Sequence, residues 1–197
     1  ILMKKVQITV LALLFITAFS CKQAKKEAQE TTEEVEETVE QVAEKIDPQV
    51  ITFEMEPKSD SNVSGEVVFT QDQGEVIMRA TFLGLDEGEH AIHLHEKADC
   101  SSADGKSTGG HWNPTFEEHG KWGSKDGYHK GDIGNFTADV DGNATVEFST
   151  DEWCIGCGDE KKDILGKAVI VHQGVDDYTS QPSGAAGARI ACTGIIQ

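Results

Sequence analysis

A series of short apolar runs with a period of two, beginning at Gln49, most constrains the fold. In the first run Ile51, Phe53 and Met55 alternate with polar neighbours, and seven more follow at residues 63–70, 75–83, 89–95, 133–140, 144–148, 167–172 and 189–196. Successive strand side chains point to opposite faces, so this alternation predicts strands with one buried face. Residues 71–74 predict a turn, and residues 141–143 predict a hairpin that pairs the runs on either side. Eight short strands without a long helix predict an antiparallel sandwich or flattened barrel.

Two long stretches interrupt this pattern. Residues 96–130 are rich in Gly, Ser, Asp and Lys and hold few apolar positions, and residues 173–188 form a second irregular segment. Loops of this length in a compact domain are usually functional. We therefore expect the chemistry of the protein to lie in them.

The first residues predict an export signal. Lys4 and Lys5 precede an apolar run from Val6 to Phe19, and small residues stand before Cys21. The run is short for a transmembrane helix. We interpret residues 1–21 as a lipoprotein signal peptide whose cleavage leaves a lipid anchor on Cys21. The alternative is an ordinary secretory signal with an incidental cysteine, and either interpretation places the mature protein where disulfides form.

Residues 22–47 predict an acidic tether between this signal and a folded domain at residues 48–197. The segment holds four Lys and nine acidic residues, with no Gly and no aromatic residue. Val35, Val39, Val42 and Ile46 would form one apolar stripe on a helix. This stripe leaves two interpretations open, a transiently helical charged spacer and a short coiled coil or partner helix.

The charge balance argues against a nucleic-acid partner. The chain has 17 Lys and Arg against 35 Asp and Glu, a net charge of −18. A phosphate-binding surface needs an excess of basic residues.

The chain has seven His residues, all between positions 90 and 172. His93 and His95 are two apart on a predicted strand, so their imidazoles share a face and can reach one metal ion. His90 has the opposite parity, and we interpret it as a hydrogen-bonded structural residue. His172 ends another predicted strand.

The first long loop holds His111, His119 and His129, followed by Asp132. Three imidazoles and one carboxylate are a ligand set that suits tetrahedral zinc. The loop has little apolar content of its own, so a bound ion could supply its order.

In their order along the chain, these motifs resemble the copper–zinc superoxide dismutases, and most closely the bacterial secreted branch. The resemblance covers about residues 49–197 and is carried by GEHAIHLH (88–95), GHWNP (110–114), HKGDIGNFTAD (129–139) and ARIAC (188–192). It implies an all-β, eight-stranded Greek-key barrel with two long functional loops. It also implies copper on His93, His95, His111 and His172, and zinc on His111, His119, His129 and Asp132.

The same resemblance implies further roles at and near the metals. His111 would bridge the two metals and take part in catalysis with Arg189, which would guide the substrate beside copper. Asp176 would hydrogen-bond a His of each metal, which fixes tautomer and ring orientation. The four Cys of the domain allow three pairings, and only the resemblance selects Cys100 with Cys192.

Cys154 and Cys157 form a CxxC motif that the family pattern does not require. We expect a small additional disulfide, with a redox motif or a metal clip as the alternatives.

The expected function is the dismutation of superoxide to oxygen and hydrogen peroxide. It would protect the bacterial cell envelope from the periplasmic side, with the protein held to a membrane by the lipid on Cys21. The domain has 11 Lys and Arg against 26 Asp and Glu, so attraction of an anion must be local. The alternatives are a copper- and zinc-binding module without turnover and an adhesion-like sandwich with incidental His. The sequence leaves monomer and homodimer open.

Overall fold

The computed structural model describes residues 47–197, which form one compact unit, Asp47–Gln197. The expected signal peptide, with Cys21, and nearly all of the expected tether lie outside the described residues. Within residues 47–197, no helix has the length and apolar character needed to cross a bilayer.

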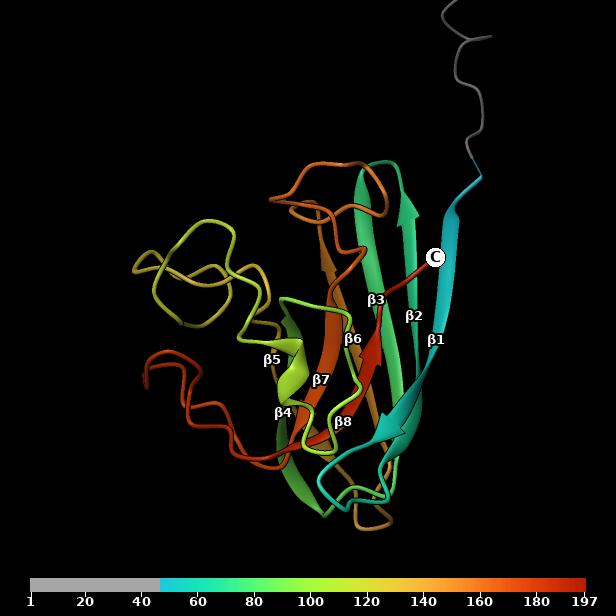
Figure 1. The fold of residues 1–197 in the computed structure, drawn as a ribbon, viewed down its shortest axis with the longest axis vertical. Coiled ribbons are helices and arrows are strands. Elements are labelled where there is room, and N and C mark those ends of the chain that lie inside the picture. Colours follow the sequence, from blue (N-terminus) through green and yellow to red (C-terminus); the bar gives the residue numbers. More distant parts are fainter. Residues whose placement is uncertain (1–46) are drawn as a thin grey trace, which may run out of the picture. The chain divides into compact units, whose positions relative to one another are not determined.

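The described part of the chain contains eight strands and one short 3-10 helix. Figure 1 shows how they are arranged. The strands are β1 (Gln49–Pro57), β2 (Ser64–Asp72), β3 (Glu75–Leu83), β4 (Gly88–His95), β5 (Gly134–Ala138), β6 (Ala144–Thr150), β7 (Ala168–His172) and β8 (Arg189–Gly194). The helix η1 (Lys106–Thr108) lies in the first long loop. All eight strands agree with the periodicity of the sequence to within about two residues at each end.

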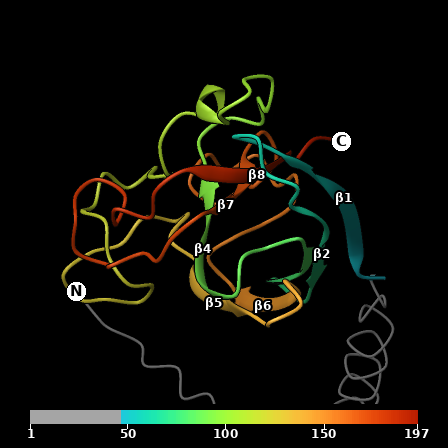
Figure 2. The same ribbon diagram turned by 90° about the horizontal axis from the view of Figure 1, so that it is seen from below.

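The strands form one antiparallel sheet in the order β5-β4-β7-β8-β1-β2-β3-β6. β3 pairs with β6 although β4 and β5 intervene in the chain, and β4 pairs with β7 although β5 and β6 intervene. These crossovers are Greek-key connections. The sheet curls into a nearly closed barrel, visible from below in Figure 2, so the predicted fold class is confirmed.

The predicted hairpin after β5 is only half correct. Residues 139–143 do form a turn, with the Asp139 amide donating to the Asn143 carbonyl oxygen at 2.9 Å. The flanking strands do not form a ladder with each other in the described part of the chain, because β5 pairs with β4 and β6 pairs with β3. The turn therefore spans the seam of the barrel.

The turn between β2 and β3 is tighter than the sequence predicts. β2 continues through Gln71 and Asp72, which pair with Val76 and Glu75. Only Gln73 and Gly74 form the loop, and both have positive φ, 48° and 87°. A two-residue loop with this geometry matches the twist of the strands, so the ladder continues to its end.

The barrel core is apolar and continuous, with Val67, Phe69, Met78, Phe82 and Ile92 among its fully buried side chains. The later, yellow part of the first long loop and the second long loop lie on the same side of the barrel, beside β4 and β5, in both views (Figures 1 and 2). The earlier, green part of the first loop lies on the side of β8 in Figure 2. The rigid barrel thus presents the predicted strand ligands to the loops that carry the others.

Candidate metal centre

Three of the candidate ligands come from the barrel itself. His93 and His95 lie on β4, and His172 ends β7, which pairs with β4. All three are buried, at 0%, 1% and 4% exposure. A β-bridge between His95 and His111 brings the first long loop against this strand. The bridge therefore places His111 directly beside the strand ligands.

The predicted copper group is assembled in the structure. One potential ligand atom from each of His93, His95, His111 and His172 lies within 4.8 Å of the others. Burial, followed by the neighbouring imidazoles, lowers the pKa of His95 and of His172 well below the ordinary value of 6.5. Burial likewise lowers the pKa of His93. At neutral pH these rings are uncharged, and a neutral imidazole is the form that binds a metal.

The predicted zinc group is assembled as well. His111, His119, His129 and Asp132 each offer an atom within 4.8 Å of the others. Asp132 lies at its centre, with its carboxylate 2.8 Å from His111 Nδ1, 3.0 Å from His119 Nδ1 and 3.2 Å from His129 Nδ1. The same carboxylate accepts the His129 backbone N–H at 2.8 Å, so the loop is wrapped around it.

His111 is the member that the two groups share. Its Nδ1 is 2.8 Å from Asp132, so Nε2 is the atom that it can offer to the copper group. Its ring centre lies 4.0 Å from that of His93 and 5.7 Å from that of His129. Burial lowers the pKa of His111 to about 4, although the bond to Asp132 opposes this. One imidazole with a nitrogen on each side is the geometry of a bridging ligand.

Buried ring nitrogens without hydrogen-bond partners indicate whether the two groups suit metal ions. In the described residues these are His93 Nδ1, His111 Nε2, His119 Nδ1 and His129 Nδ1. His119 and His129 approach Asp132 closely through these atoms, yet without hydrogen-bond alignment. Buried nitrogen atoms are rarely left unpaired in proteins. Lone pairs and a carboxylate directed at the same space suit a cation, so the residues fit a metal at each group.

Asp176, in the second long loop, connects the two groups. Its carboxylate accepts from His93 Nε2 and from His119 Nε2, both at 2.9 Å. These bonds hold the pKa of Asp176 well below its ordinary value despite its burial. Because Nε2 of each ring donates to Asp176, Nδ1 of each is the nitrogen left for a metal. Burial opposes protonation of His119, but the nearby carboxylates of Asp132 and Asp176 outweigh it and raise its pKa to about 9.

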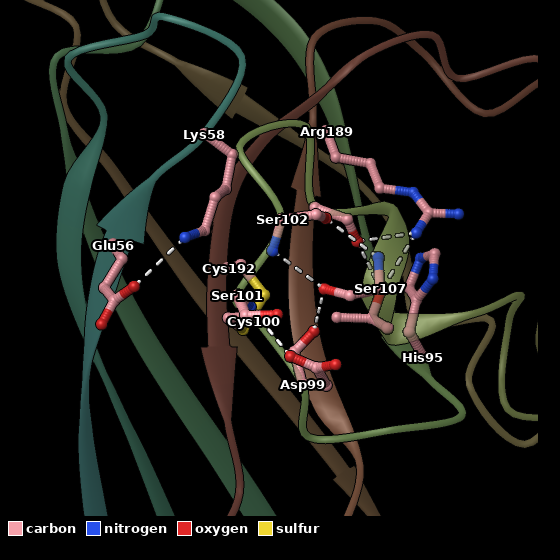
Figure 3. Close-up of a disulfide and its surroundings, with 12 residues drawn as sticks. Glu56, Lys58, His95, Asp99, Cys100, Ser101, Ser102, Ser107, Arg189 and Cys192 are labelled. Atoms are coloured by element: carbon pink, nitrogen blue, oxygen red, sulfur yellow. Dashed lines mark hydrogen bonds and ion pairs between the residues drawn. A yellow bond between two sulfur atoms is a disulfide. The ribbon is translucent and has the colours of Figure 1, made fainter.

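Arg189 lies at the open side of the copper group. Together with His95, His111 and His172 it lines a pocket of about 630 Å³. Its Nη1 donates to the Gly105 carbonyl oxygen and to Thr108 Oγ1, both at 2.9 Å. Figure 3 shows the guanidinium held by the first long loop on the same side as His95. The anchoring fixes a positive charge at the entrance to the site.

Two disulfides are present in the structure. Cys100 is joined to Cys192, which ties the first long loop to β8 near Arg189 (Figure 3). Cys154 is joined to Cys157, so the CxxC motif closes on itself. The structure agrees with both expected pairings.

His90 belongs to neither metal group, in agreement with its predicted structural role. Its Nδ1 is 3.0 Å from the His172 carbonyl oxygen, and its Nε2 is 2.9 Å from the carbonyl oxygen of Asp86. Its ring also packs against that of Phe136. His90 therefore supports the backbone of His172 from inside the barrel.

Sequence reasoning missed three residues that support the site. Asn135 exchanges two hydrogen bonds with the backbone of Asp176, and Gln181 does the same with the backbone of His119. Gly184 has a φ of 65°, and a Cβ there would overlap the Asp176 carboxylate. Gly184 lies in a Gly-rich run and Asn135 in the motif at residues 129–139, which are weak signals, whereas Gln181 offered none.

Comparisons with known proteins agree with this geometry. Residues 63–196 match the family model described as copper/zinc superoxide dismutase. A Cu-Zn superoxide dismutase of Caulobacter vibrioides is 37% identical over 142 residues, which cover 70% of this chain and 80% of that protein. Superoxide dismutase [Cu-Zn] 2 of Aquifex aeolicus is 34% identical over 143 residues, covering 71% and 82%.

Solved structures with the same fold carry several descriptions. A SOD-like protein from Bacillus subtilis is 29% identical with a TM-score of 0.65, covering 74% of this chain and 97% of that one. The clock protein EA4 is 32% identical with a TM-score of 0.65, covering 76% and 96%. Because these descriptions differ, the fold alone does not identify the reaction. The complete set of metal ligands must identify it.

The fold is a Greek-key barrel, and two ligand groups share one imidazole. These features define a class of β-barrel proteins with two metal sites, one rich in histidine and one formed by histidines and a carboxylate. The matched family model and the relatives above then identify the family. The chain belongs to the copper/zinc superoxide dismutases.

Proposed function

We propose that this protein dismutes superoxide to oxygen and hydrogen peroxide, with copper on His93, His95, His111 and His172 and zinc on His111, His119, His129 and Asp132. The observation that carries the proposal is the position of His111, one ring with a nitrogen available to each group. Two independent sites would need no shared ligand.

Copper, when bound, supplies a one-electron couple, so that one superoxide is oxidised to oxygen and a second is reduced and takes two protons to become peroxide. The protein's part begins with the rings. His93, His95 and His172 stay neutral because burial lowers their pKa values. His111 Nε2 is the atom at which the chain can take up and release a proton, since Nδ1 stays directed at Asp132 on the zinc side.

Arg189 supplies the attraction for the anionic substrate. The domain carries 26 acidic residues against 11 Lys and Arg, so its overall field repels superoxide. Among residues 47–197, Arg189 is the only Lys or Arg that lines the pocket beside the copper group. Its two hydrogen bonds to the first loop hold the charge at the pocket entrance. Substrate attraction is therefore a local property of this residue.

The two ligand groups come from one chain, and so do Asp176 and Arg189. The proposed reaction therefore needs no residue of a second subunit. A homodimer would add stability or association without completing the site. Sedimentation of the mature protein distinguishes a monomer from a dimer.

The proposal places the protein at the bacterial cell envelope, on the periplasmic side, anchored by a lipid on Cys21. It is supported by the order of basic residues, apolar run and small residues before Cys21, and by the disulfides of the domain. Metabolic labelling with a fatty-acid analogue tests it. The wild-type protein should incorporate label and a Cys21→Ser variant should not; equal labelling would refute the anchor.

Metal analysis with a dismutase assay tests the enzymatic proposal. The purified protein should hold one copper and one zinc per chain and consume superoxide. Full metal content without turnover would replace the enzyme by a module for metal delivery or storage.

A further inference from the structure

The CxxC motif is a feature of the folded domain that the proposed function does not use. It lies directly after Glu152 and Trp153, which follow the end of β6. These two residues contact both chain neighbours of the zinc-group residue His129. The contacts indicate a role for this segment at the metal centre.

Glu152 binds the side chains on either side of His129. The Tyr128 hydroxyl donates to Glu152 Oε1 at 2.7 Å. The Lys130 ammonium forms an ion pair with Glu152 Oε2. One carboxylate thus holds both neighbours of the ligand, each by a different oxygen.

Trp153 holds the backbone at the same place. Its indole N–H donates to the Lys130 carbonyl oxygen at 2.8 Å. The ring is 1% exposed and packs against Phe148 and Trp122, with ring centres 5.0 and 5.9 Å apart. A buried ring fixed by the core presents this donor in one orientation. The peptide between Lys130 and Gly131, one residue beyond His129, is therefore tied to the barrel.

The segment that follows Trp153 is closed on itself. Cys154 is bonded to Cys157, and its backbone exchanges hydrogen bonds with Lys162 and Ile164 at 2.8 and 3.0 Å. The Asp163 carboxylate accepts three backbone N–H groups, from Gly156, Gly158 and Leu165. These bonds keep residues 154–165 in one conformation, directly after the buried Trp153.

We propose that Glu152 and Trp153 are positioning residues for the zinc ligand His129, and that the disulfide-closed loop after them holds them in place. The inference rests on the proposed function, because it takes zinc as the occupant of this group. It explains why His129 keeps its place in a loop with little apolar content. It also assigns the Cys154–Cys157 disulfide a structural role at the metal centre in place of a redox or metal-clip role.

Zinc release from the holoenzyme into a chromogenic chelator tests the proposal. Trp153→Phe keeps an aromatic ring in the cluster and removes the N–H donor, and Glu152→Gln removes the ion pair to Lys130. Both should release zinc faster, by roughly three- to tenfold. A Cys154→Ser/Cys157→Ser double variant should change the rate in the same direction by less.

Trp122→Phe is the matched control. Trp122 packs in the same aromatic cluster, but its indole has no hydrogen-bond partner within residues 47–197. This variant should release zinc more slowly than Trp153→Phe does, because it keeps the indole donor to the Lys130 carbonyl oxygen and disturbs only the packing around it. Equal acceleration in Trp122→Phe and Trp153→Phe would overturn the proposal, because packing alone would then account for the effect.

Spectroscopy separates positioning of His129 from a general loss of structure. With cobalt(II) in place of zinc, the ligand-field bands should change in Trp153→Phe and Glu152→Gln, while the copper(II) resonance of the holoenzyme stays unchanged. Equal disturbance of both metals would contradict the proposal. Should Trp153→Phe fail to fold, Glu152→Gln, at a partly exposed residue, carries the test.

Zinc binding by the wild-type protein distinguishes failure of the zinc assignment from failure of the positioning role of Glu152 and Trp153. A wild-type protein that takes up no zinc contradicts the zinc assignment and this inference with it. A wild-type protein with stable zinc, and variants that release it at the same rate, contradict the inference alone.

Discussion

The two ligand groups are built from different kinds of structure. His93, His95 and His172 belong to paired strands of the barrel, whereas His119, His129 and Asp132 belong to a long loop that includes a single 3-10 turn. The strand ligands are placed by the barrel's register before any metal binds. The loop ligands need Asp132 at their centre, together with outside supports such as Asp176 and Trp153. We infer that the barrel organises the copper group, while zinc organises the loop.

His111→Ala should have the largest effect, because it removes a ligand from both groups at once. We expect dismutase activity to fall by at least about a hundredfold, and the copper and zinc spectra to become independent of each other. A superoxide assay and copper resonance check this. Wild-type activity would show that the two groups do not work through a shared ring.

Asp176→Asn should weaken the zinc group more than the copper group, although the residue contacts both. It leaves His119 without a carboxylate acceptor for Nε2, and His119 lies in a loop, whereas His93 is held by β4. We expect zinc affinity to fall by about 10- to 100-fold. Competition with chelators for each metal measures this, and equal losses for copper and zinc would remove the contrast between strand and loop.

The pH dependence of metal affinity should also separate the groups. His119 has a pKa raised to about 9, so zinc must displace its proton, and zinc affinity should fall as the pH decreases below about 9. One displaced proton gives about tenfold per pH unit. His95 and His172 have pKa values well below 6.5, so these rings stay unprotonated between pH 6.5 and about 9. Copper affinity should therefore stay constant over this pH interval. Chelator competition at several pH values measures both slopes, and equal slopes would be inconsistent with this assignment.

The raised pKa of His119 also makes the stability of the metal-free protein depend on pH. A pKa raised from 6.5 to about 9 means that charged His119 stabilises the fold fully below 6.5. This contribution is lost as the pH rises through about 9.

Arg189→Ala should have the smallest effect of the three substitutions and should leave both ligand groups intact. We expect kcat/KM for superoxide to fall by about tenfold, with a weaker dependence on salt, because the local attraction is lost. Metal content should not change. Arg79, the only other arginine of the chain, lies on β3 in an exposed ion pair with Glu147, so Arg79→Ala is the matched control. An equal effect of both substitutions would assign the attraction to the overall charge.

The sequence predicted the strands from local signals, whereas the full ligand set came from the ordered motifs that carry the family resemblance. A period of two marks each strand, and the spacing of His93 and His95 places both on one face. The seam between β5 and β6 could not be predicted, because the turn at residues 139–143 fits a paired hairpin equally well. Register in a closed sheet is decided by all strands together.

The supports of the site were harder to predict than its ligands. Asn135 and Gln181 act through peptide groups of residues 41 and 62 positions away. Glu152 and Trp153 reach the chain neighbours of His129 only because the chain returns past the first loop after β6. Irregular loops carry no periodicity from which such encounters can be inferred.

The central claim is that one imidazole, His111, joins the two metal groups. Copper(II) resonance of the protein with copper alone, and then with cobalt(II) added to the zinc group, tests it most directly. The account predicts that added cobalt suppresses the copper signal, since the two ions interact magnetically through a shared ring. A full copper signal with cobalt bound would contradict it.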